Sequence, residues 1–236
     1  MYTATFGWSV AAGACTVLGA VMLFIKRKWS RRGLAFFLGL AAGVMLAVVV
    51  FDLLPSGLVA GRVFGTLWGL ACGMILLGMA QGLLFTGDGA GASLVGLGYL
   101  IMLGVALHDL PEGMAIALGH ELKARTGMVI ALGVAIHNIP EGMAIATPLL
   151  MGGVRRVRIL LQVLLVGAIT PFGTVLGLAA VNFLPWYLPF FLGLASGVML
   201  YLVLFQLWPE ARQHNSRFRH AGFWLGVVLI FTATYI

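Results

Sequence analysis

A histidine and a glutamate four residues apart occur twice in the middle of this 236-residue chain, as His108 with Glu112 and as His137 with Glu141. Residues four apart lie on one face of an α-helix, so each pair can act together. Imidazole nitrogen and carboxylate oxygen are both ligands of divalent transition metals. The two pairs therefore predict a metal site.

Each pair belongs to a longer duplicated segment, with GVALHDLPEGMAIA at 104–117 and GVAIHNIPEGMAIA at 133–146, in which eleven of fourteen residues are identical. Asp109 and Asn138 add oxygen donors beside the histidines. The proline before each glutamate lacks an amide hydrogen, so we expect a kink and a freed carbonyl there. Irregular backbone of this kind is tolerated at membrane depth where it lines a cavity.

The composition is that of an integral membrane protein: 61% of the residues are hydrophobic, 9% are charged, and the mean hydropathy is +1.07. Soluble chains carry about 25% charged residues, so a soluble domain is excluded. A carboxylic acid at the bilayer centre costs about 2.5–3.5 kcal/mol. Asp109, Glu112 and Glu141 therefore need a compensating cation.

Apolar runs of the length that spans a bilayer occur eight times, separated by short polar or glycine- and proline-containing breaks. These runs occupy about 5–25, 34–54, 63–85, 94–119, 127–150, 159–181, 186–208 and 221–236. The duplicated His and Glu residues lie near the middle of the fourth and fifth runs.

A second repeat relates the two ends of the chain, because FFLGLAAGVML at 36–46 recurs as FFLGLASGVML at 190–200. The copies lie in the second and seventh runs, so they cross the membrane in opposite directions, as in many secondary transporters. We predict an all-α membrane protein with eight transmembrane helices in a 3+2+3 inverted-repeat arrangement. It would form a single transporter domain over 1–236, with repeat one at about 5–85, the central pair at about 94–150 and repeat two at about 159–236.

The basic residues indicate the orientation, because eleven lie in the odd-numbered connections between runs and three in the even-numbered ones. The positive-inside rule then places the odd-numbered connections in the cytoplasm and both termini outside. Asp52 would lie near the outer mouth of a transport pathway, and its repeat partner Gln206, with Glu210, near the inner mouth. The +7 charge thus reflects topology, and no nucleic-acid partner is expected.

Other interpretations of the His/Glu pairs remain open on the residues alone. A single pair could be a structural bridge or a proton relay, and a non-metal proton or anion channel is a third reading. An intramembrane zinc-dependent hydrolase is the alternative from another class, since such ligands can hold a catalytic zinc. The symmetric pairing favours transport of a metal ion, and no GxxxxGK[ST] motif is present to couple it to ATP hydrolysis.

The paired HDLPEG and HNIPEG motifs, on the fourth and fifth of eight predicted spans, resemble the signature of the ZIP family of divalent metal transporters. The resemblance covers essentially the whole chain. It implies that zinc or a related divalent ion moves into the cytoplasm through a central site, and that the chain is not an enzyme. It also implies that His108, Glu112, His137 and Glu141 occupy the family's metal-ligand positions, beside Asp109 and Asn138.

The resemblance also marks one departure at Thr170, an expected residue of the transport pathway, which precedes Pro171 where two-metal members have a glutamate. One strong metal site and at most one weak second site are therefore expected. The ligand types favour Zn²⁺ and also allow Cd²⁺, Fe²⁺, Mn²⁺, Co²⁺ and Ni²⁺, and no resident cofactor is expected. The other expected partner is membrane lipid, and small-residue helix faces permit a homodimer. The expected location is the plasma (inner) membrane of a prokaryote.

Overall fold

The structure is a computed structural model that describes residues 2–25, 29–59, 63–84, 93–180 and 184–235. Every regular element in these ranges is a helix. Seven helical stretches are long and apolar enough to cross a membrane by length and composition. In a bilayer the backbone must satisfy its own hydrogen bonds, and a helix does so within one segment. The predicted all-α class is confirmed.

The helices follow the eight predicted apolar runs, and three of the runs are built from more than one element. The elements are α1 (Tyr2–Phe24), α2 (Arg31–Val48), η1 (Val49–Leu53), α3 (Leu54–Val59), α4 (Val63–Leu84), α5 (Leu94–Leu122), α6 (Ala124–Met151), α7 (Arg156–Gly167), α8 (Ile169–Ala179), α9 (Leu184–Tyr201), η2 (Leu202–Leu207), α10 (Trp208–His214) and α11 (Ser216–Tyr235). The eighth run corresponds to α11, which begins at Ser216, before the expected residue 221.

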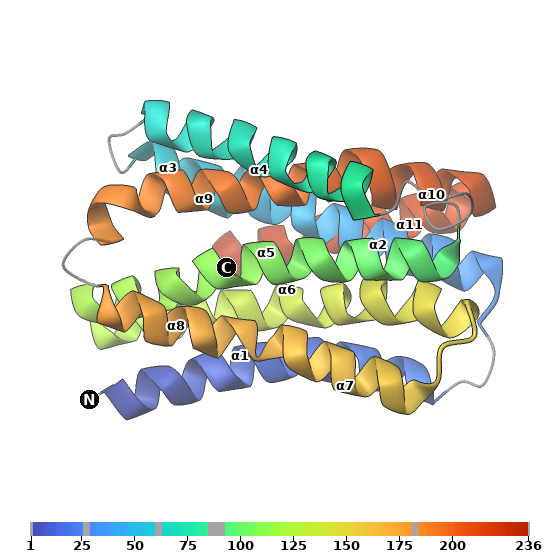
Figure 1. The fold of residues 1–236 in the computed structure, drawn as a ribbon, viewed down its shortest axis with the longest axis horizontal. Helices are drawn as coiled ribbons and strands as arrows, with labels where there is room; N and C mark the ends of the chain where they lie inside the picture. Colours follow the sequence, from blue (N-terminus) through green and yellow to red (C-terminus); the bar gives the residue numbers. More distant parts are fainter. Residues whose placement is uncertain (1, 26–28, 60–62, 85–92, 181–183, 236) are drawn as a thin grey trace.

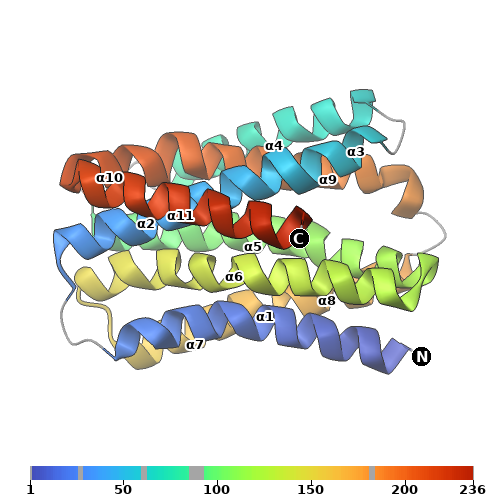
Figure 2. The same cartoon turned by 180° about the vertical axis from the view of Figure 1, so that it is seen from behind.

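The helices lie side by side along the long axis of the molecule, with their connections gathered at two ends (Figure 1). We call the end at which α2, α7 and α11 begin the basic end, because Arg31, Arg155, Arg158, Arg212 and Arg217 lie there. The view from behind shows α11 running along α2 from the basic end toward the end at which α1 begins (Figure 2). The central pair, α5 and α6, lies between the other helices (Figures 1 and 2).

Helix contacts occur in matched pairs. Helix α2 packs against α11 as α9 packs against α4, and α1 packs against α6 as α8 packs against α5. Glycines make the close approaches: a Cβ on Gly43 would overlap the carbonyl of Phe223, and a Cβ on Gly197 would overlap that of Leu70. Gly43 and Gly197 hold equivalent places in the two copies of the FFLGLA segment. Small residues thus let these helix backbones touch.

Irregular backbone occurs directly after α2 and α9. Helices α5 and α6 are each continuous through Pro111 and Pro140, and the kinks and freed carbonyls expected there stay predictions. The π-helical turns η1 and η2 separate α2 from α3 and α9 from α10. They occupy matching places in the FFLGLA repeat, and each precedes a proline, at Pro55 or Pro209. Such π-turns are often found at functional sites.

Candidate metal centre

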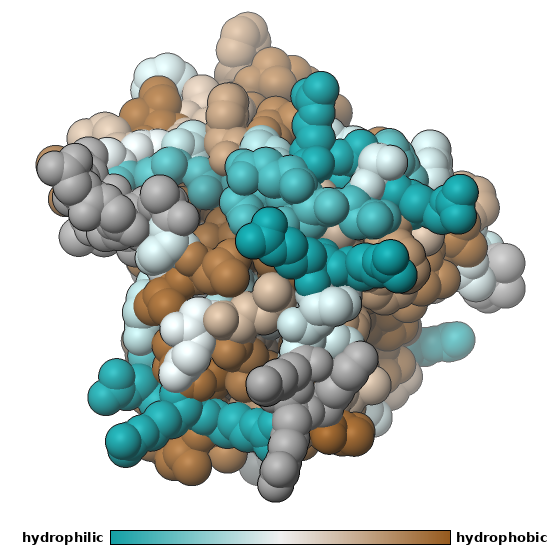
Figure 3. All heavy atoms as spheres, turned by 90° about the vertical axis from the view of Figure 1, so that its right-hand side faces the viewer, coloured by the Kyte–Doolittle hydropathy of each residue, from teal (hydrophilic) through white to brown (hydrophobic). Residues whose placement is uncertain are grey.

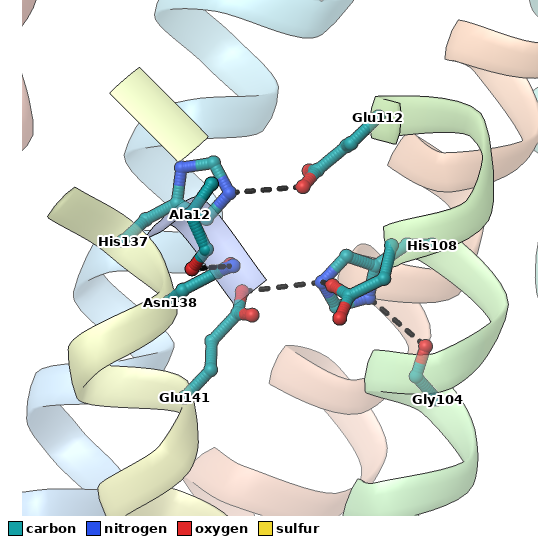
Figure 4. A network of polar contacts seen from close by, with 8 residues as sticks. Ala12, Gly104, His108, Glu112, His137, Asn138 and Glu141 are labelled. Carbon is teal, nitrogen blue, oxygen red and sulfur yellow. Dashed lines mark hydrogen bonds and ion pairs between the residues drawn. The ribbon is translucent and has the colours of Figure 1, made fainter. Parts of the chain in front are cut away.

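The two His/Glu pairs face each other across the contact between α5 and α6 and pair crosswise (Figure 4). His108 Nε2 lies 3.2 Å from Glu141 Oε1, and His137 Nε2 lies 3.0 Å from Glu112 Oε2. Each histidine therefore contacts the glutamate of the other helix rather than the one four residues away. All four side chains are buried. The antiparallel pairing of two copies of one motif produces this arrangement.

The hydrogen bonding of His108 shows which ring nitrogen is free. Its Nδ1 lies 2.9 Å from the carbonyl oxygen of Gly104, which can only accept, so Nδ1 carries a proton. The other ring nitrogen, Nε2, faces Glu141 Oε1 at 3.2 Å and Asp109 Oδ1 at 3.6 Å. A proton or a metal ion on Nε2 makes these contacts favourable, and without either the nitrogen and oxygen lone pairs repel each other. A backbone carbonyl that fixes the far nitrogen is the usual support of a metal-ligating histidine.

Oxygen atoms without a partner gather at the same place. Both carboxylate oxygens of Asp109, Oε1 of Glu112, Oε2 of Glu141 and Oδ1 of Asn138 are buried without a hydrogen bond. Ligand atoms of His108, Asp109 and Glu112 lie within 4.8 Å of one another. Burying three carboxylates is very costly unless cations compensate them, as a bound metal ion or protonated histidines would. The donor set, imidazole nitrogen with carboxylate oxygen, is one that suits a divalent transition metal.

Neighbouring helices hold the central pair through equivalent contacts. Asn138 donates from Nδ2 to the carbonyl oxygen of Ala12 on α1, at 3.0 Å, which leaves its Oδ1 free. A Cβ on Gly113 would overlap the carbonyl of Thr170, and a Cβ on Gly142 would overlap that of Thr16. Each threonine therefore lies against the glycine that follows a site glutamate.

Thr16 is a residue that our sequence reasoning missed. Its hydroxyl, like that of Thr170, is buried without a hydrogen-bond partner. Thr16 and Thr170 are separated by the same interval as the two FFLGLA segments, as are Gly19 and Gly173 beside them. Extending the repeat to the first and sixth runs would have identified it.

A cavity of about 170 Å³ reaches the site from one side. It is lined by Glu112 and His137 at its inner part and by the exposed residues Asp52 and Ser56, among others. Thr126, near the start of α6, also lines it, so the cavity extends away from the basic end. The structure therefore brings Asp52 into the same cavity as two of the candidate ligands.

On the side of the basic end, apolar side chains close the site. Ile101 and Val105 precede His108 on α5, Leu149 follows Glu141 on α6, and Leu202 packs against Gly104. All four have an exposed fraction of 0%. All four side chains belong to the same hydrophobic core cluster.

The predicted inner-mouth residues lie beyond this seal. Gln206 and Glu210 line a separate polar cavity of about 330 Å³, with Gln81 and Gln213 among its other residues. Gln206 donates to Gln81 Oε1 at 2.7 Å, and Glu210 Oε1 accepts from His214 at 2.9 Å. The structure therefore does not bring these two residues to the central site.

A multi-pass helical bundle with a buried His/carboxylate cluster and a cavity leading to it is the arrangement expected of a membrane protein that binds metal ions. The family model described as "ZIP Zinc transporter" matches residues 86–234 of this chain. The chain is also 32% identical over 229 residues to the "Zinc transporter ZIPB" of Bordetella bronchiseptica, a match that covers 89% of this chain and 74% of that protein. The chain belongs to the ZIP family.

Shorter matches point to the same family. The chain is 32% identical over 135 residues to the "Zinc transporter ZupT" of Escherichia fergusonii, over 51% of each protein. It is 32% identical over 122 residues to the ZupT of Enterobacter sp. strain 638, covering 46% of that protein. These matches thus span about half the length of the ZupT relatives. The predicted ZIP resemblance is confirmed, and membership of a transporter family decides against the intramembrane hydrolase.

Proposed function

We propose that this protein transports Zn²⁺ into the cytoplasm, and that His108, Glu112, His137 and Glu141 bind the ion during transport. The observation that carries the proposal is the orientation of His108, whose Nδ1 is held by the Gly104 carbonyl while Nε2 faces two carboxylates. A metal ion between these atoms would be bound by the imidazole nitrogen and the carboxylate oxygens together. Asp109 and Asn138 supply oxygen atoms beside the four ligands.

Zinc is favoured because it accepts both imidazole nitrogen and carboxylate oxygen, and because the matching family and relatives are named for it. The same ligands would admit Cd²⁺, Fe²⁺, Mn²⁺, Co²⁺ and Ni²⁺ to different degrees. Uptake of this panel of ions into proteoliposomes tests the function. Saturable zinc uptake above that of protein-free vesicles would support the proposed function. The absence of saturable uptake for every ion of the panel would reject it.

The pathway we propose begins at the cavity that contains Asp52 and ends beyond the apolar seal, near Gln206 and Glu210. The present conformation is accessible from the side of Asp52. Rocking of one helix group against the other would open the second side and close the first. A divalent ion gains about 4.6 kcal/mol on moving inward across 100 mV, twice the value for a single charge, so the membrane potential can drive uptake.

This direction requires the basic end to face the cytoplasm, with both termini outside, in the plasma membrane of a bacterium. The 3+2+3 inverted repeat within one domain is part of the same proposal. It is supported by the matched helix contacts and by the equivalent positions of η1 and η2. The proposal includes a homodimer, in which helix faces with small residues on the lipid-facing surface would pack against a second copy of the chain.

Cysteine labelling tests the orientation. In a background in which Cys15 and Cys72 are replaced, Arg125→Cys should react with a membrane-impermeant maleimide in intact cells. Arg156→Cys, at the basic end, should react only after the membrane is opened, because the reagent cannot cross it. Both positions are exposed, so neither should be protected by burial. The opposite labelling pattern would reverse the assigned direction of transport.

The number of ions follows from the donors available beside the four ligands. A second ion would depend on Asp109, Asn138 and Thr170, of which only Asp109 carries a charge. Neutral oxygen offsets far less of a divalent ion's desolvation than a carboxylate does. We therefore expect one strong site and at most one weak site. The buried hydroxyl of Thr170 lies on the helix that packs against α5, where a carboxylate could reach a second ion.

Equilibrium dialysis of purified protein over rising zinc concentration counts these sites. Thr170→Glu should raise the affinity of the second site, and Asp109→Asn should remove that site while sparing the first. Two equally tight ions in the unmodified protein would show that another group replaces the missing carboxylate. Thr174→Ser, which keeps a hydroxyl on the same helix, is the control and should leave both affinities unchanged.

A further inference from the structure

Arg219 is a buried cation that the transport site does not use. It lies near the start of α11, at the basic end, and its exposed fraction is 7%. The backbone carbonyl of Arg219 touches Gly39, so α2 lies directly against this turn of α11. Helix α10 contributes Trp208, whose ring centroid lies 4.7 Å from the Arg219 guanidinium carbon. The guanidinium is therefore held where α2, α10 and α11 meet.

Most of the hydrogen-bonding capacity of this guanidinium is unsatisfied. Its Nη2 lies 3.4 Å from His220 Nε2, and His220 Nδ1 donates to the carbonyl of Ser216 at 2.7 Å, so Nε2 is the accepting nitrogen. Nε and Nη1 of Arg219 have no hydrogen-bond partner. These two atoms carry three of the five N–H donors of an arginine. Such a group has a large uncompensated desolvation cost.

Carboxylates within the described residues do not compensate it. At the basic end the described carboxylate is that of Glu210, which pairs with His214 at 2.9 Å. The same end carries the exposed cations Arg31, Arg32, Arg212 and Arg217. Hydrophilic side chains gather over this end in Figure 3, with apolar surface around them. The electrostatic field of these cations attracts an anion. The Trp208 ring interacts with the guanidinium but offsets only part of the charge of Arg219.

The depth of the site indicates where the anion comes from. On α11, Phe218 directly precedes Arg219 and Trp224 follows it by five residues, and the two side chains are exposed by 40% and 60%. Aromatic side chains of this kind gather at the level of lipid headgroups, just outside the hydrocarbon. An anion at this depth, with apolar surface beside it, has the chemistry of an anionic phospholipid. Clusters of basic residues on the cytoplasmic side of membrane helices attract such lipids.

We propose that Arg219 binds the phosphate group of an anionic glycerophospholipid, at a site formed with Trp208 and His220 where α2, α10 and α11 meet. The phosphate oxygens accept from the guanidinium, and the acyl chains lie along the exposed face of α11. Arginine suits this role because its charge is permanent and its planar N–H groups match phosphate geometry. The site is independent of the proposed metal ligands on α5 and α6.

Thermal unfolding of the purified protein tests the proposal, with phosphatidylglycerol, phosphatidylcholine or inorganic phosphate added at equal concentration. Phosphatidylglycerol should raise the midpoint by several degrees more than phosphatidylcholine, and Arg219→Gln should abolish this difference. Arg158→Gln removes one exposed charge from the same end and should preserve it. If both variants lost the difference between the two lipids equally, the cause would be general electrostatic attraction, and the proposed site would be wrong. An equal shift with inorganic phosphate would show a free-anion site and overturn the lipid assignment.

Native mass spectrometry of the unmodified protein keeps the proposal testable if Arg219→Gln does not fold. After exposure to equal amounts of the two lipids, the protein should retain phosphatidylglycerol in clear excess, and Arg158→Gln should do the same. Equal retention of both lipids would contradict a specific headgroup site. Arg219→Lys, which keeps the charge but loses the planar fork, should retain less phosphatidylglycerol than the wild type.

Discussion

Replacing Glu141 or His137 by alanine should reduce saturable zinc uptake into proteoliposomes by at least about 100-fold, because each removes a ligand whose partner is then left buried and unpaired. Loss of Glu141 leaves His108 Nε2 facing only Asp109, and loss of His137 leaves Glu112 without its hydrogen bond. Equilibrium dialysis should show a matching loss of zinc affinity. Both effects should occur while the protein still reaches the membrane.

Two further variants separate metal binding from structural support. Glu141→Gln keeps the size and hydrogen-bonding ability of the side chain but removes its charge, so it should fold normally and still fail to transport. Glu121→Ala removes an exposed carboxylate from α5 and should leave uptake near the wild-type rate. Wild-type uptake in both Glu141→Gln and His137→Ala would reject the proposed ligand set.

The sequence predicted the ligand types but not their pairing. The spacing of four residues placed His108 and Glu112 on one face, which the helix α5 confirms. Spacing within one helix carries no information about a second helix, so the crosswise pairs with Glu141 and His137 could not be read from it. That pairing follows from the antiparallel contact of α5 and α6, which is tertiary structure.

The backbone irregularity shows a second limit of local reasoning. Proline chemistry predicted a kink and a freed carbonyl at Pro111 and Pro140, and it does not by itself say whether the helix continues; both helices do, because a helix can lose one hydrogen bond and keep its course when neighbours pack around it. The π-turns η1 and η2 lie in apolar segments that each end two residues before a proline, Pro55 or Pro209, a signal that our sequence reasoning did not connect with irregular backbone. Their equivalence was visible only through the FFLGLA repeat, and the same comparison would have found Thr16.

Gly142→Ala should destabilise the protein and impair zinc uptake, although the change adds a single methyl group. A Cβ at this position would overlap the carbonyl of Thr16, so α1 and α6 would have to separate. Overpacking of this kind costs about 1–3 kcal/mol, and small residues are what allow membrane helices to approach so closely. Because Gly142 follows Glu141 directly, the separation also displaces a proposed ligand. Thermal unfolding and uptake measure the two effects.

Gly133→Ala is the matched control, because it makes the same change on the same helix. A Cβ on Gly133 would meet nothing within 4 Å, so it causes no overlap. Alanine favours a helix over glycine by up to about 1 kcal/mol, so this variant should be as stable as the wild type or more so. Equal loss of stability in the two variants would mean that helix propensity or lipid contact decides the outcome. A loss confined to Gly142→Ala would show that the close contact of α1 with α6 holds Glu141 in place.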